Sequence, residues 1–186
     1  MRDKTKWLFA RTLADMLGEK SLEKIHVNEL CERCGEHRQL FYYHFRDKYD
    51  LVAWIYDQEY AAAISSPQCT DYRSLVILML ENLWEHREFY RKAFADKTQN
   101  SIERHIHETN LEESGRLLRR YCGVRKLSRE QTHAILFHSF GSVGTAIEWL
   151  RGNLKATPAE LADWHFSHIP DFLREAHEAE VLEHKR

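Results

Sequence analysis

The chain has 186 residues, of which 43% are hydrophobic and 30% are charged, and its formal net charge is -2. This composition is typical of a globular chain that can bury one sizeable core or two smaller ones. A net charge so close to zero excludes a uniformly basic nucleic-acid-binding protein, but it allows a local basic surface. No apolar run is long enough to span a bilayer and no signal peptide is recognisable, so we expect a cytoplasmic protein that has no membrane partner.

The elements expected along the chain are helices only. The sequence has three Pro and seven Gly residues and no strand-like alternation, which predicts an all-α fold. The first helix should span about residues 4–19. Its apolar residues recur at the spacing of one core-facing side, at Phe9, Leu13, Met16 and Leu17.

Residues 28–36 and 37–45 together have the pattern of a helix-turn-helix. The first segment reads as a short helix that ends at Cys34-Gly35, and the second reads His-Arg-Gln-Leu-Phe-Tyr-Tyr-His-Phe. In such a unit the second helix lies in the major groove of DNA. Phe41 and Phe45, four residues apart, should form its buried side. The alternative is an aromatic-rich amphipathic helix that only packs in a core.

The side chains of the second segment suit contacts to DNA. Arg can make a forked contact to guanine, and Gln can make one to adenine, whereas hydroxyl, imidazole and ammonium groups reach phosphate oxygens. We therefore expect base or groove contacts from Arg38, Gln39 and Tyr43, and phosphate contacts from Tyr42, His44 and Lys48. The complete expected set of DNA-binding positions is His26, Asn28, His37, Arg38, Gln39, Leu40, Tyr42, Tyr43, His44 and Lys48.

Two cysteines in the first segment require a separate interpretation. Cys31-x-x-Cys34 lies close to His26 and His37, and zinc sites use such ligands. Both cysteines, however, fall at inward positions of a helix that must pack tightly, where Cys behaves as a small hydrophobic residue. We expect packing and no metal or cofactor, with a metal or redox site as the alternative.

The rest of the chain predicts a larger helical domain. A helix that follows residues 46–48 should end at Ser65-Ser66-Pro67. Further helices are expected at 72–86, near 89–94, and at 100–122 before Gly123. Two capping boxes, Ser128-x-x-Gln131 and Thr157-Pro158-Ala159-Glu160, should open a long helix that runs to Gly152 and a last helix that Pro170 kinks.

Two sets of residues in this larger domain are candidates for binding. Aromatic side chains with a few polar groups suit a ligand pocket, and that set is Trp84, Phe89, Phe94, Leu117, Tyr121, His133 and Phe137. The two capped helices, each with an apolar stripe, could form a four-helix bundle with a second copy. The expected interface residues are Phe140, Gly144, Ile147, Leu161, Trp164 and His168. For both sets the alternative is that the side chains serve the domain's own core.

The N-terminal region resembles the TetR family of transcription regulators over about residues 6–55. The residues that carry the resemblance are Phe9, Leu13, Met16-Leu17, Val27-x-x-Leu30-Cys31-x-x-Cys34-Gly35 and Phe41-Tyr42-Tyr43-His44-Phe45-x-x-Lys48-x-x-Leu51. The run from Gly141 to Leu161 is similar to a subgroup that includes regulators of dihydroxyacetone kinase operons. The resemblance implies a three-helix DNA-binding domain at 1–48, and a helical ligand-binding and dimerisation domain at 49–186.

The sequence departs from the family pattern at four positions of the helix-turn-helix. The family usually has a hydroxyl residue at 26 and 37, an apolar residue at 36 and often Thr at 40, whereas this chain has His26, Glu36, His37 and Leu40. Imidazole is a poorer helix cap than a hydroxyl, and Glu36 would be repelled by phosphate unless it points away or contacts a cytosine amino group. These changes thin the expected backbone contacts.

These patterns favour a dimeric DNA-binding protein, and the resemblance implies a repressor that a small molecule releases or modulates. The expected partners are a near-palindromic double-stranded operator, a second copy of the chain and an unidentified effector. An enzyme is not expected, because no phosphate loop, nucleophile elbow, zinc-protease helix or dinucleotide turn occurs. The alternative is an all-α interaction or ligand-binding module that has kept a degenerate DNA unit.

Overall fold

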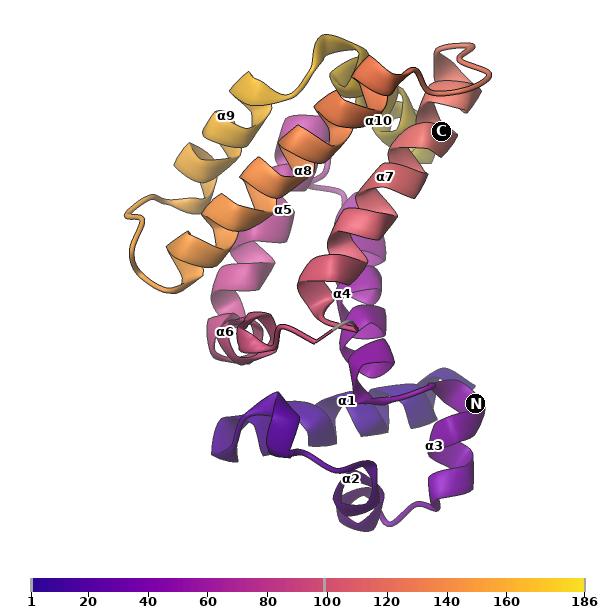
Figure 1. Cartoon of the computed structure of the whole chain (residues 1–186), viewed down its shortest axis with the longest axis vertical. Coiled ribbons are helices and arrows are strands. Elements are labelled where there is room, and N and C mark those ends of the chain that lie inside the picture. The colour runs from indigo at the N-terminus through magenta and orange to yellow at the C-terminus, as the bar shows by residue number, and fades with distance from the viewer. Residues whose placement is uncertain (1, 99, 186) are drawn as a thin grey trace. The chain divides into compact units, whose positions relative to one another are not determined.

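The computed structural model describes residues 2–98 and 100–185, and within them every regular element is helical. This confirms the all-α prediction (Figure 1). The elements are α1 (Arg2–Glu19), the short 3-10 helix η1 (Leu22–Lys24), α2 (Val27–Cys34), α3 (Arg38–His44), α4 (Lys48–Ser65), α5 (Tyr72–Glu85), α6 (Arg87–Ala95), α7 (Ile102–Tyr121), α8 (Arg129–Leu150), α9 (Pro158–His168) and α10 (Asp171–His184).

The chain divides into two compact units. Unit 1 comprises Met1–Gln58 and His86–Arg104, and unit 2 comprises Glu59–Glu85 and His105–Arg186. In unit 1, α1 packs against both α2 and α6, and α2 packs against α3. In unit 2, α5 packs against α8, α9 and α10, and α8 also packs against α9.

The core of unit 1 is built around α1. Its predicted stripe is buried, with Phe9, Leu13 and Met16 each at 0% exposure and Leu17 at 1%. Phe9 meets the ring of Phe41 edge to face at 5.2 Å, so α1 supplies the surface on which α3 rests. The periodicity of the first helix therefore reported its buried side correctly.

The core of unit 2 gathers side chains from its last long helices. Tyr72, at the start of α5, is partly buried against this core, and its ring stacks on His177 of α10 with ring centroids 4.4 Å apart. The buried residues of this cluster are Leu117, Leu118, Ile135, Ile169, Leu173 and Ala176.

Both capping boxes form as predicted. Ser128 Oγ accepts the amide of Gln131 at 3.1 Å, and Thr157 Oγ1 accepts the amide of Glu160 at 3.2 Å, while each third residue bonds back to the cap. A side chain that satisfies an otherwise unpaired amide in this way fixes where the helix begins.

The predicted kink at Pro170 is wrong. The helix that opens at Thr157 ends at His168, and Ile169 and Pro170 are extended, with ψ angles of 135° and 137°. A separate helix, α10, starts at Asp171. The residue before a proline disfavours helical dihedrals, and here that preference ends one helix and allows a new one to begin.

The single apolar stripe predicted for α8 is also a simplification. Val143 and Ile147 are buried at 8% and 5% exposure, whereas Phe137 and Phe140 are exposed at 75% and 58%. Val143 and Ile147 serve the core of unit 2, whereas Phe140, seven residues before Ile147 and on nearly the same side of α8, presents its ring outward.

Candidate DNA-binding surface

The turn between α2 and α3 is set by a left-handed glycine. Gly35 has φ 68°, and its amide donates to the Glu32 carbonyl at 3.2 Å, while the Glu36 amide donates to the Cys31 carbonyl at 3.0 Å. This pair of bonds is the Schellman arrangement, which ends α2 and turns the chain toward α3. The predicted helix-turn-helix thus has a physical basis in Gly35.

The buried side of α3 is aromatic, as predicted. Phe41 is 0% exposed and Phe45 is 3% exposed. Phe45 also meets Trp54 of α4 edge to face at 5.7 Å. Because α3 has only seven residues, these rings, rather than its own hydrogen bonds, hold it in place.

The opposite side of α3 is open and chemically suited to DNA. Arg38 and Gln39 are exposed, and Tyr42 and Tyr43 are 48% and 63% exposed. The Arg38 guanidinium lies 5.6 Å from the centre of the Tyr42 ring, so the cation is supported by the ring one turn later. Donors, acceptors and two phenolic hydroxyls therefore share one surface.

The starts of α2 and α3 lack side-chain caps. Neither His26 nor His37, the two N-cap residues, makes a capping hydrogen bond in the described structure, and both are exposed. Amides at the start of a helix that no side chain satisfies can bind phosphate oxygens. Of the other expected DNA-binding positions, Asn28 is exposed, and Leu40 and His44 are half-buried.

Lys48 lies in a different environment from the one expected. Its Nζ donates to the backbone carbonyls of Glu23 at 2.9 Å and Ile25 at 2.8 Å, and burial lowers the pKa of its ammonium group. The side chain is thereby directed at the connection between α1 and α2. A phosphate contact from Lys48 stays a prediction, and these bonds compete with it.

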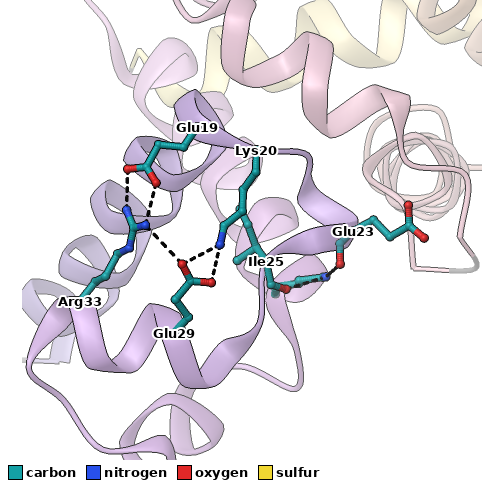
Figure 2. A network of polar contacts seen from close by, with 7 residues as sticks. Glu19, Lys20, Glu23, Ile25, Glu29 and Arg33 are labelled. Carbon is teal, nitrogen blue, oxygen red and sulfur yellow. Dashed lines mark hydrogen bonds and ion pairs between the residues drawn. The ribbon is translucent and has the colours of Figure 1, made fainter.

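A charged network fixes α2 against the end of α1. Figure 2 shows Arg33 facing Glu19 and Glu29, and Lys20 facing Glu29. The distances are 2.6 Å from Arg33 to both Glu19 oxygens, 3.2 Å from Arg33 to Glu29, and 2.5 Å from Lys20 to Glu29. The bond to Arg33 lowers the pKa of Glu19, and the bond to Lys20 lowers that of Glu29. Several charges that form one network contribute more to stability than an isolated surface ion pair does.

The two cysteines of α2 take part in packing. Cys31 is 2% exposed, and the Cys34 thiol donates to Thr12 Oγ1 at 3.2 Å. Burial raises the pKa of both thiols, which keeps them protonated and poorly reactive. Within residues 2–98 and 100–185, no group of three or more His, Cys, Asp or Glu side chains is arranged to hold a metal ion.

The seven expected pocket residues are divided between the two units. Phe89 and Phe94 belong to unit 1, and the other five belong to unit 2. Within unit 2, Leu117 is buried in the core, whereas His133 and Phe137 are exposed and stack on each other at 6.4 Å. Trp84 packs on Trp149 at 4.7 Å, and Tyr121 bonds to Glu183. A pocket made of this set stays a prediction without geometric support.

Four of the six expected interface residues can reach a partner. Ile147 and Leu161 are 5% and 0% exposed, so their side chains serve the core of unit 2 and are withdrawn from the expected interface. Phe140, Gly144, Trp164 and His168 are exposed.

A buried polar cluster in unit 2 was missed by the sequence. Glu180 is 5% exposed, accepts from Arg116 at 2.6 Å and from Tyr60 at 3.3 Å, and lies 4.0 Å from His177. Burial, followed by the charges of His138 and Arg116, lowers the pKa of His177 to about 3. No local motif announces this cluster, because its members come from α4, α7 and α10.

No helix among the described residues has both the length and the apolar content needed to cross a membrane.

A TetR-type family model described as "Transcriptional regulator C-terminal region" matches residues 71–169, which is more than half of the chain. The chain is 27% identical over 93 residues to the HTH-type dhaKLM operon transcriptional activator DhaS of Lactococcus lactis subsp. lactis (strain IL1403). That match spans 48% of this chain and about half (49%) of the relative.

The fold has a counterpart among solved structures. The structure of a dihydroxyacetone kinase operon activator, DhaS, is similar with a TM-score of 0.59 and 18% identity, and the match covers 89% of this chain and 93% of that one. At this identity the likeness concerns the fold alone, and it agrees with the all-helical structure of this chain. The chain belongs to the TetR family of DNA-binding transcriptional regulators.

Proposed function

We propose that the chain binds a near-palindromic operator as a homodimer, with α3 of each copy in one of two successive major grooves. The observation that carries this proposal is the division of α3 into a buried side of Phe41 and an open side of Arg38, Gln39 and Tyr43. A two-fold dimer presents two such helices about 34 Å apart, which matches one turn of B-DNA.

The exposed aromatic rings of unit 2 support a homodimer. Phe137, Phe140 and Trp164 are 75%, 58% and 45% exposed, although rings of this size are usually buried. Gly141 and Gly144, which follow Phe140 on α8, have nothing within 4 Å of the position that a side chain would occupy. Flat glycine positions beside protruding rings allow two copies of a helix to approach closely.

We further propose that a small molecule acting on unit 2 changes operator affinity. Such an effector works only through a difference in its affinity for two states of the protein. The sequence suggested a repressor that the effector releases. The relative from Lactococcus lactis is named as an activator, which supports the alternative that this chain activates transcription when the effector is bound.

The second candidate function is an interaction or ligand-binding module with a degenerate DNA unit. His26, His37 and Leu40 favour it, because they replace hydroxyl residues that usually help the family to bind the DNA backbone, and Glu36 adds a negative charge that phosphate would repel. Electrostatic attraction alone would then give weak binding to any duplex, with strong salt dependence.

Selection of duplexes from a random pool by the purified protein, at two salt concentrations, tests the proposal. A recovered near-palindrome with half-sites about one helical turn apart would support it. Retention of random duplexes only, and only at low salt, would favour the second candidate. A reporter that carries the recovered site upstream or downstream of a promoter start then decides between activation and repression.

A further inference from the structure

The connection between α1 and α2 is held at both ends by lysines from distant parts of unit 1. At its far end, Lys48 of α4 donates to the carbonyls of Glu23 and Ile25 at 2.9 and 2.8 Å. At its near end, Lys92 of α6 donates to the carbonyl of Gly18 at 3.0 Å and also to that of Leu17. Each ammonium group thus bridges two backbone oxygens.

These carbonyls are ones that the local backbone leaves in need of donors. Leu17 and Gly18 lie in the last turn of α1, where carbonyls have no amide partner within the helix and carry the negative end of its dipole. Glu23 and Ile25 lie at the end of η1, which has only three residues. An ammonium group has three donors and a full charge, so it satisfies two carbonyls at once.

The surroundings of Lys48 favour this role over contact with DNA. Burial lowers the pKa of Lys48, while Asp96, Glu23 and Asp47 favour its charged form. Removing an ammonium group from water is costly unless hydrogen bonds replace those to solvent, and the two carbonyls supply these. Turning Lys48 toward a phosphate would leave both carbonyls without this donor.

The bonds from Lys48 and Lys92 to these carbonyls, which we call the clamp, lie next to an element that is expected to bind DNA. Ile25, one of the two residues that Lys48 holds, directly precedes His26, the N-cap of α2. The start of α2 in turn fixes the turn at Gly35 and the beginning of α3. An error of about 1 Å at this point would displace every base contact of α3 together.

We infer that Lys48 and Lys92 are positioning residues for DNA recognition, which clamp the backbone between α1 and α2, and that Lys48 does not serve as a phosphate ligand. This inference rests on the proposed binding of DNA through α3. It assigns to Lys48 the opposite role from the one that its place in the sequence pattern suggested.

The test compares Lys48→Met, which keeps the length of the side chain but removes its charge, with Lys48→Arg and with Lys24→Met. Lys24 is exposed on η1, so its replacement removes one charge from the same connection without touching the clamp. Each variant is measured for melting temperature without DNA, and for affinity toward the selected duplex at several salt concentrations.

Lys48→Met should lower the melting temperature by about 3–6 °C, in line with the loss of two charge-assisted bonds in a chain of this size. At a temperature where the variant is fully folded, its affinity for the operator should fall by about tenfold, with an unchanged slope of log affinity against log salt. Lys48→Arg should recover most of both losses, and Lys24→Met should leave the melting temperature within about 1 °C. Lys92→Met should behave as Lys48→Met does.

Two results would overturn the inference. A loss of salt slope of about one in Lys48→Met, at an unchanged melting temperature, would identify a phosphate ligand. A lower melting temperature with unchanged operator affinity in the folded variant would show that the clamp stabilises the fold but does not position α3 for DNA. If the unaltered chain selected no duplex, the proposed function would fail separately. Amide hydrogen exchange across residues 20–26 would still test whether Lys48 holds this backbone, because exchange should accelerate in Lys48→Met and stay slow in Lys24→Met.

Discussion

Replacing Phe140 by Ser should separate the proposed homodimer into folded monomers. Phe140 is 58% exposed on α8, beside Gly144 and near the still more exposed Phe137. An aromatic side chain offers roughly 150–250 Å², so about 120 Å² of this ring is open to a partner. At about 25 cal/mol per Å², full cover would contribute up to about 3 kcal/mol per copy.

A two-fold interface loses this contribution twice, because each copy presents the same residue. The upper limit is therefore about 6 kcal/mol, and ordering and desolvation costs reduce what is seen in the binding constant. We take about half of it as the expected effect. A loss of about 3 kcal/mol weakens dimerisation by roughly 100-fold.

Sedimentation equilibrium over nanomolar to micromolar concentrations measures this change. Leu182→Ser is the matched control, because Leu182 is 55% exposed but lies on α10, outside the proposed interface. Helical circular dichroism checks that Phe140→Ser still folds, since Phe140 also contacts the ring of His107 at 4.1 Å. Equal dissociation constants for the two variants, or a monomeric unaltered chain at micromolar concentration, would refute the reasoning.

Three other changes have defined outcomes. Arg38→Ala should cost about 1–3 kcal/mol of operator binding and relax the preference at one base pair, which a repeated duplex selection would reveal. Folding lowers the pKa of His177 to about 3 from 6.5, so the unfolded state binds a proton at a higher pH than the folded state does. The free energy of unfolding should therefore be highest above pH 6.5 and about 2 kcal/mol lower at pH 5. Denaturant titrations should show that fall reduced in His177→Gln. Ser128→Ala should lower the free energy of unfolding by about 1 kcal/mol through loss of the cap on Gln131, while operator affinity stays unchanged in a band-shift assay.

The features that the sequence predicted well are those whose causes are local. The capping box at Ser128 needs only a residue three positions away. The end of α2 needs only a glycine that accepts a φ of 68°. The buried stripe of α1 needs only a constant angular spacing. In each case the interacting atoms lie within one or two helical turns, so neighbouring letters of the sequence contain the cause.

The features that failed depend on what covers a surface. Phe140 and Ile147 are seven residues apart, which places them within about 20° on an ideal helix. Periodicity treats them alike, yet Ile147 is covered by its own unit and Phe140 is not. The clamp by Lys48 spans 23 and 25 positions, and the Glu180 cluster joins residues 64 and 120 positions apart. No pattern of neighbouring residues contains such pairings.

A contrast between four helix starts, those of α8 and α9 and those of α2 and α3, links stability to function. In unit 2, α8 and α9 begin with complete capping boxes at Ser128 and Thr157. In unit 1, α2 and α3 begin at His26 and His37 with no side-chain cap in the described structure. A cap and a phosphate compete for the same first-turn amides, so a helix that is capped by its own side chain offers fewer donors to DNA. We therefore expect the helix-turn-helix to obtain its rigidity from the rings beneath α3 and from the lysines that bond to backbone carbonyls, and to leave the first-turn amides of α2 and α3 available for DNA.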